Sequence, residues 1–132
     1  MSKRIFVKIL TDPEVDLRKC VVGLACAAQA INDNHRVDIF FASNGVKLLQ
    51  TNYLKSINET LDLPDDLSIK LMSTIIEGAE NIYCSTGSQA ANGINPDNAE
   101  GILLDGWDEW MTWSGPPGVI ELSIKSDTQL IY

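Results

Sequence analysis

Short apolar runs alternate with longer amphipathic segments through the first two thirds of the chain. The apolar runs are rich in β-branched and aromatic residues, so they predict three strands, at residues 4–10, 36–43 and 81–85. Between the runs, apolar residues recur every three or four positions, which is the spacing of one helix face. The segments with this spacing predict three helices: 15–34, 46–57, and a third that opens at Pro64-Asp65-Asp66.

The final third of the chain is less regular. Its apolar segments predict a fourth strand within 99–106, a short helix in "WDEWMTW" (107–113), a fifth strand at 118–124, and a last strand or a tail at 128–132. No repeat, low-complexity tract or linker interrupts the sequence, so we expect a single domain over residues 1–132. Strands that alternate with helices, and that are nearly continuous apolar runs, are typical of a parallel sheet covered on both faces. The expected fold class is therefore α/β.

Ligands of such sheets bind outside the carboxyl ends of the strands, so the loops that follow the strands are candidate site elements. Three loops are expected to meet at that edge. They contribute Thr11 and Asp12 after the first strand, Asn44 and Gly45 after the second, and Cys84 with Ser85, Thr86 and Gly87 after the third. We expect the first two loops to shape a pocket around the third.

Cys84 ends the third predicted strand, immediately before a possible helix start at Ser85, Thr86 and Gly87. The free N–H groups and the dipole of such a helix would stabilise a thiolate, lower the thiol pKa below about 8.5, and make Cys84 a nucleophile. The alternative is that Cys84 only packs, as most free cysteines do. Cys20 and Cys26 lie inside the first predicted helix, and we interpret both as buried packing residues.

Charge and composition argue against several function classes. The chain has 10 Lys and Arg against 18 Asp and Glu, a formal net charge of -8, and its basic residues are scattered. We therefore expect no binding to nucleic acid or to an anionic membrane. No segment approaches the roughly 20 apolar residues of a membrane span. The three cysteines form neither a disulfide framework nor a zinc motif, which predicts no metal site and favours a reducing, cytoplasmic setting.

Two further features have a structural interpretation. His35, the single histidine, precedes the second strand at the end opposite Cys84, so we interpret it as a turn residue and not as a base for the thiol. Trp107, Trp110 and Trp113 lie close together near the end of the chain. Since tryptophan is enriched at interface centres, they predict either core packing or a subunit contact.

Three pieces of the sequence, in this order, resemble the DsrE/DsrF-like family of small sulfur-relay proteins, of the TusD type. They are "ILTDPEVD", "GLACAAQAINDNHRVDIFFASNGVKLL" and "GAENIYCSTGSQAANGI", within about residues 4–105. The resemblance implies a three-layer α/β/α sandwich with about five strands, and assembly into a homo-oligomer, either a trimer or a hexamer. It also implies a persulfide-carrying cysteine at the position of Cys84. The ending "WDEWMTWSGPPG" departs from the family pattern, and no cysteine follows Cys84.

The first hypothesis is therefore a cytoplasmic sulfur carrier, in which Cys84 accepts sulfane sulfur from a donor protein and passes it to an acceptor thiol. This chemistry requires no metal or organic cofactor. It leaves open whether the protein is an enzyme or only a sulfurtransferase-like carrier. One alternative is a binding module that holds an anion or a nucleotide-like ligand on the helix start while Cys84 is inert. Another is an oligomeric assembly protein with a vestigial crevice.

Overall fold

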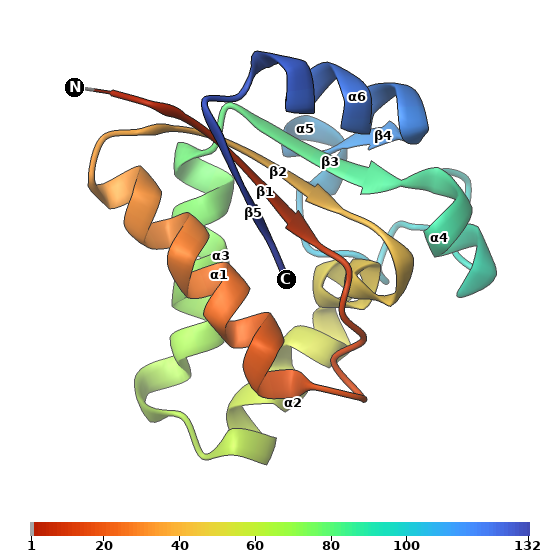
Figure 1. Ribbon diagram of the computed structural model, residues 1–132. Helices are drawn as coiled ribbons and strands as arrows, with labels where there is room; N and C mark the ends of the chain where they lie inside the picture. Colours follow the sequence, from red (N-terminus) through yellow and green to blue (C-terminus); the bar gives the residue numbers. More distant parts are fainter. Residues whose placement is uncertain (1) are drawn as a thin grey trace.

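The computed structural model describes residues 2–132, apart from the side chain of Asp65. Five strands form one parallel sheet in the order β4-β3-β2-β1-β5 (Figure 1). Helices cover both faces of this sheet, which confirms the predicted α/β class with three layers. The strands are β1 (Arg4–Ile9), β2 (Arg36–Phe41), β3 (Asn81–Ser85), β4 (Thr112–Ser114) and β5 (Thr128–Ile131).

Helical segments connect each strand to the next. Because parallel crossovers are right-handed, connections that move in one direction along the sheet lie on one face, and the connection that returns lies on the other. Accordingly, α1 and α3 lie on one side of the sheet and α6 lies on the opposite side (Figure 1). The connections are α1 (Leu17–Asn32); the 3-10 helix η1 (Ser43–Leu49), α2 (Thr51–Leu61), the 3-10 helix η2 (Pro64–Asp66) and α3 (Leu67–Gly78); α4 (Thr86–Ala91) and α5 (Trp107–Trp110); and α6 (Pro116–Lys125).

Alternation along the strands divides the apolar side chains between two cores. The main core lies between the sheet and α1, α2, α3 and η1. The strands supply to it Val7, Ile9, Val37, Ile39, Phe41, Ile82 and Cys84. The smaller core lies under α6, where Leu122 and the half-buried Val119 pack on Phe6 and Phe40.

The segment 118–124, predicted as a strand, is instead part of α6. Pro116 and Pro117 occupy the first turn, where a missing N–H is tolerated. Val119 and Leu122, three residues apart, then form the face that packs on the sheet. The spacing of these two residues is helical, and the apparent alternation of Ile120, Leu122 and Ile124 was misleading.

The predicted fourth strand at 99–106 is also wrong. That segment forms turns, and only Leu103 makes an isolated bridge, to Gln50. The fourth strand of the chain is β4. The segment 107–113, predicted as a short helix, forms α5 and then the first two residues of β4. Of the two alternatives for residues 128–132, a last strand or a tail, the structure shows the strand, β5.

Candidate functional site

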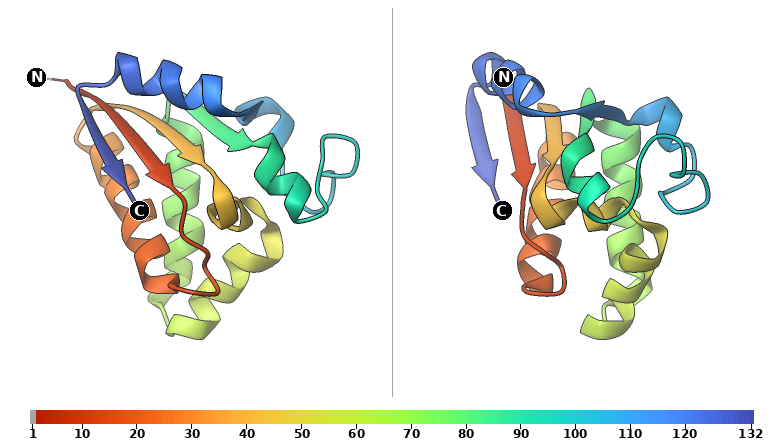
Figure 2. Two further views of the ribbon diagram at one scale, coloured as in Figure 1. Left: turned by 45° about the vertical axis from the view of Figure 1, so that its right-hand side comes forward. Right: turned by 90° about the vertical axis from the view of Figure 1, so that its right-hand side faces the viewer.

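Cys84 is the penultimate residue of β3, and α4 begins two residues later, as the sequence led us to expect. Ser85 is the N-cap of α4, since its hydroxyl oxygen accepts a hydrogen bond from the backbone N–H of Ser88 at 3.1 Å. The six-residue helix continues past the end of the sheet and is followed by the irregular segment 92–106 (Figure 2).

The thiol of Cys84 belongs to the main core and is 0% exposed. Its sulfur donates a long hydrogen bond, 3.7 Å, to the carbonyl oxygen of Ser85. Burial raises the pKa of the Cys84 thiol to about 12, and a hydrogen bond with the Gln89 side chain offsets only part of this effect. The expectation of a pKa below about 8.5 is therefore corrected. The thiol faces apolar side chains, and the loss of hydration outweighs the short helix beside it.

Gln89 is the polar side chain that the structure places next to this thiol, and the sequence did not identify it. Gln89 is 0% exposed. Its amide nitrogen donates to the carbonyl oxygen of Val46 at 3.0 Å, and its amide oxygen accepts from the amide nitrogen of Gln50 at 3.3 Å. Gln89 thus joins α4 to η1 over Cys84. Within "GSQAANG" a glutamine carries no signal, because only tertiary packing buries it.

The residues predicted to stabilise the thiolate form the start of α4. Thr86 and Gly87 are exposed, and the Thr86 hydroxyl donates to the carbonyl oxygen of Ser114 at 3.2 Å. Among the hydrogen bonds of the described residues, none joins Cys84 to Thr86 or Gly87. The role of Ser85, Thr86 and Gly87 as thiolate-stabilising groups stays a prediction.

The loop after β1 is tied to η1 through Lys47, another residue that the sequence did not single out. The Lys47 ammonium lies 3.0 Å from the Asp12 carboxylate, and both side chains are largely buried. Burial lowers the pKa of Lys47, but the hydrogen bond and charge of Asp12 outweigh it and leave the pKa raised. Burial likewise acts to raise the pKa of Asp12, yet the backbone N–H of Glu14 and the Lys47 ammonium lower it overall. Both groups are therefore charged at neutral pH, and their ion pair holds η1 against the loop after β1.

The other predicted pocket residues occupy different surroundings. The carbonyl oxygen of Thr11 accepts a hydrogen bond from the Cys20 thiol at 3.3 Å, and Asn44 is exposed on η1. Gly45 is buried against the backbone carbonyl of Ile9, which leaves no room for a side chain. In the part of the chain that the structure describes, no hydrogen bond joins Thr11, Asp12 or Asn44 to Cys84, so a shared pocket stays a prediction.

The loops after β2 and β3 do meet. The backbone N–H of Ser43 donates to the Ser88 hydroxyl on α4 at 2.9 Å. Together with Gln89, this bond makes α4 and η1 one packed unit at the carboxyl edge of the sheet.

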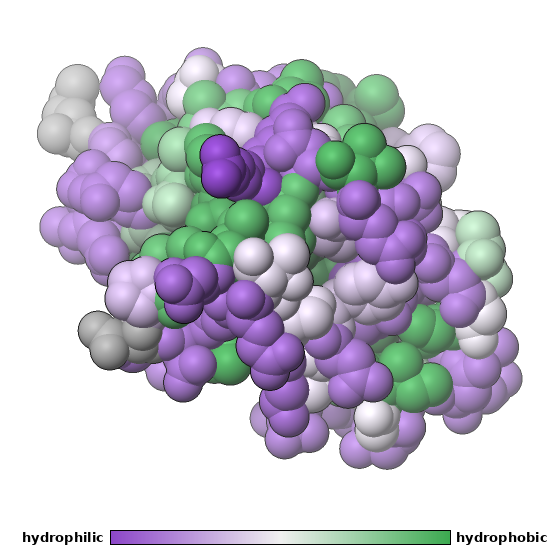
Figure 3. Space-filling view, turned by 90° about the horizontal axis from the view of Figure 1, so that it is seen from below, coloured by the Kyte–Doolittle hydropathy of each residue, from purple (hydrophilic) through white to green (hydrophobic). Residues whose placement is uncertain are grey.

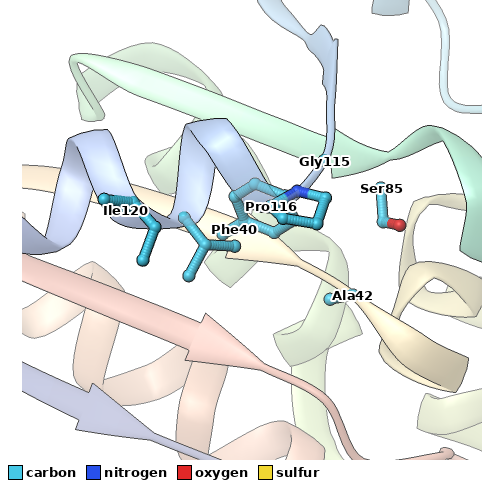
Figure 4. A pocket seen from close by; sticks show the side chains of 7 residues that line it. Phe40, Ala42, Ser85, Gly115, Pro116 and Ile120 are labelled. Atoms are coloured by element: carbon cyan, nitrogen blue, oxygen red, sulfur yellow. The ribbon is translucent and has the colours of Figure 1, made fainter.

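A cavity of about 280 Å³ lies on the opposite face of the sheet, at the start of α6. Ile120 and Pro116 lie above Phe40 and Ala42, and Ser85 closes one end (Figure 4). Ser85 is the one polar side chain in a lining that consists of Phe40, Ala42, Ser85, Gly115, Pro116, Val119 and Ile120. Such a lining suits an apolar ligand better than the anion or nucleotide-like ligand of the binding-module alternative.

His35 and the three tryptophans have structural contacts. The Nδ1 atom of His35 accepts a hydrogen bond from the backbone N–H of Lys3 at 3.0 Å, at the amino end of β2, which confirms His35 as a turn residue. Trp107, Trp110 and Trp113 are half-buried against the main core, and the rings of Trp107 and Trp113 meet edge to face at 5.8 Å. These contacts support the core-packing interpretation of the tryptophans.

Residues 2–132 contain no group of three or more His, Cys, Asp or Glu side chains arranged to hold a metal ion. Over the same residues, the search for a helix with the length and apolarity needed to cross a membrane found none.

No family model matches the sequence, and a search of curated proteins found no similar sequence. Among solved structures, the chain is similar to the YchN protein from E. coli, with a TM-score of 0.58 and 14% sequence identity over 100% of both chains. The likeness extends over the whole α/β fold described above. At this identity it shows the fold alone.

Proposed function

We propose that this protein is a sulfur carrier in which Cys84 holds sulfane sulfur as a persulfide. The observation that carries the proposal is the position of Cys84, at the carboxyl end of a central strand in a fold shared with YchN. This is the edge where parallel sheets bind their ligands, and the sequence resemblance assigns the persulfide cysteine to the same position. A carrier needs a protected site more than a permanently reactive one, and the burial of Cys84 supplies that protection.

The proposed loading step begins when α4 moves and exposes the thiol. Cys84 loses its proton, and the thiolate attacks the outer sulfur of a donor persulfide, R–S–SH. A sulfur–sulfur bond forms on Cys84 as the donor's own sulfur–sulfur bond breaks, and the donor leaves as the thiol R–SH with the proton that Cys84 lost. Delivery to an acceptor thiol is the same displacement with Cys84 as the leaving group. The sulfane sulfur moves without any external oxidant or reductant.

We propose that the carrier works as a homo-oligomer, a trimer or a hexamer, between donor and acceptor proteins in a reducing cytoplasm. The family resemblance and the absence of a disulfide framework in the sequence support this setting. Exposed apolar side chains support self-association: on α6, Ile120 and Ile124 are 59% and 78% exposed. Apolar side chains also reach the surface on the face seen from below (Figure 3).

The test is to incubate the purified protein with cysteine hydropersulfide, remove the reagent, and measure the intact mass. We expect an increment of one sulfur atom, which maps to the peptide containing Cys84 and is removed by dithiothreitol. Cys84→Ser and Cys84→Ala should lack the increment while circular dichroism shows a folded protein, and Cys26→Ser should retain it. A wild-type protein that never gains sulfur on Cys84 contradicts the proposal. The cavity at the start of α6 would then be the site to examine for ligand binding.

A further inference from the structure

Trp113 carries a buried polar atom without a hydrogen-bond partner. Among the described residues, its Nε1 atom is the one buried side-chain nitrogen or oxygen that has no partner. The neighbouring tryptophans differ, since Trp107 Nε1 donates to the Glu100 carboxylate at 3.2 Å and Trp110 Nε1 donates to the carbonyl oxygen of Asp105 at 3.0 Å. An unpaired buried donor is unfavourable and is uncommon in native proteins. It leaves Trp113 Nε1 as a free donor for a group that binds beside it.

The strand register places Trp113 next to Cys84. Trp113 lies directly opposite Cys84 in the parallel register of β3 and β4. Paired residues on adjacent parallel strands point to the same face, and such strands are about 4.8 Å apart. Both side chains accordingly belong to the main core. The edge-to-face contact with Trp107 holds the Trp113 ring in this place.

We propose that the indole N–H of Trp113 is a positioning donor for the outer sulfur of the Cys84 persulfide. This inference rests on the proposed function. A persulfide places a second sulfur about 2.05 Å beyond the thiol sulfur. The outer sulfur carries the negative charge once the persulfide ionises, and charge-assisted hydrogen bonds are stronger than neutral ones. In the unloaded protein the Cys84 thiol is neutral and donates its proton to the carbonyl oxygen of Ser85. It therefore offers no charged acceptor to the indole N–H of Trp113, which has no partner.

The inference accounts for two features together. Burial disfavours a thiolate at Cys84, yet a loaded carrier must accommodate a sulfur anion in the same surroundings. Gln89 lies beside the thiol from α4, and Trp113 lies beside it from β4. Once Cys84 is loaded, the indole N–H of Trp113 would stabilise the persulfide anion by a hydrogen bond.

The direct test is nuclear magnetic resonance of the three ¹⁵N-labelled indole N–H groups before and after loading with cysteine hydropersulfide. Single Trp→Phe variants assign the signals. We expect the Trp113 signal to move downfield and its hydrogen exchange to slow, while the Trp107 and Trp110 signals stay in place. A protein that gains sulfur on Cys84 but leaves the Trp113 signal unmoved overturns this inference and retains the proposed function. A protein that gains no sulfur on Cys84 overturns both.

A variant gives the second test. Trp113→Phe keeps an aromatic ring but removes the donor, so the persulfide should be removed by dithiothreitol about tenfold faster than in the wild type. The matched control is Trp110→Phe, whose N–H already has a backbone acceptor and which should change the half-life less than about twofold. Equal half-lives for Trp113→Phe and wild type overturn the inference. If Trp113→Phe does not fold, Trp107→Phe and Trp110→Phe still assign the Trp113 signal in the wild type, and the resonance measurement decides.

Discussion

At the scale of single residues, Cys84 is a buried and protonated thiol, and not a reactive thiolate. Its complete burial and the rise of its pKa to about 12 mean that the resting protein holds it protonated at neutral pH. Cys20 is similar, since burial raises its pKa to about 11. Cys26 differs from our expectation, because it is half-buried and not buried. The proposed reaction at Cys84 therefore requires that the structure around the thiol opens.

The raised thiol pKa values predict that stability falls at alkaline pH. In the unfolded chain a thiol titrates near pH 8.5, whereas folded Cys84 keeps its proton up to about pH 12. Between these values the folded state binds more protons than the unfolded state, so the free energy of unfolding decreases as pH rises, by about 1.4 kcal/mol per pH unit for one thiol. Below about pH 8.5, where the thiol is protonated in both states, its full contribution to the free energy of unfolding is present.

Chemical denaturation between about pH 9 and 11 measures this effect. We expect Cys84→Ala to have a flatter stability curve than the wild type, with a slope smaller by about 1.4 kcal/mol per pH unit. Ile82→Val, on the same strand, is the matched control, because it should lower stability without changing the slope. Equal slopes for Cys84→Ala and wild type would show that the thiol is not held protonated by the fold.

At the scale of elements, α4 and η1 together cover Cys84. They are joined by the Gln89 side chain and by the bond between the Ser43 N–H and the Ser88 hydroxyl. Lys47 then joins η1 to the loop after β1 through Asp12. η1 is also anchored in the main core by Val46, Leu48 and Leu49, whereas Gln89 is the one buried residue of α4. We therefore expect α4, the lid over the thiol, to open locally before the whole protein unfolds.

Gln89→Ala should loosen this lid. The substitution leaves the Val46 carbonyl and the Gln50 amide without their partner, which costs about 1–3 kcal/mol and makes opening correspondingly more frequent. Alkylation of Cys84 by iodoacetamide, followed by peptide mass spectrometry, should accelerate about tenfold or more. Gln29→Ala is the control, since Gln29 is an exposed glutamine on α1 that bonds to Asp33. If Cys84 reacts no faster in Gln89→Ala than in this control, Gln89 does not hold the lid.

At the scale of the whole molecule, the surface of α6 is the better argument for self-association. The tryptophans that first suggested a subunit contact pack against the main core of their own chain. By contrast, Ile120 and Ile124 project from α6 with no apolar neighbour to cover them fully. Large exposed apolar side chains that gather on one element often mark an interface.

We expect light scattering at micromolar concentration to give a mass of three or six times the 14.5 kDa of one chain. The double substitution Ile120→Lys and Ile124→Lys should shift the protein to the monomer, because it places charges in the proposed interface. Val22→Lys, at an exposed apolar position on α1, should leave the assembly intact. A wild-type mass of 14.5 kDa would contradict self-association altogether, and an unchanged mass in the double variant would place the interface elsewhere.

The sequence by itself determined the first three strands, the first helix, and the position of Cys84 at the carboxyl end of β3. These features follow from local patterns: β-rich runs that are buried on both faces, helical spacing between them, and small polar residues where a strand ends. The single helix predicted at 46–57 is instead the end of the 3-10 helix η1 followed by the start of α2. The last third of the chain lacks such clear patterns. There Ile120, Leu122 and Ile124 alternate as in a strand, but Ile120 and Ile124 are exposed and the segment belongs to a helix that starts at Pro116 and Pro117.

Only the tertiary structure decided what surrounds the thiol. A strand-end cysteine beside polar residues predicted a low pKa, but whether such a thiol meets water or a core depends on residues distant in sequence. Gln89 is buried because η1 packs on α4, and Trp113 faces Cys84 because β4 pairs with β3 in one particular register. Neither the burial nor the register is encoded in a short stretch of residues. Both arise from contacts between segments far apart in the chain, and these contacts set the chemistry of the site.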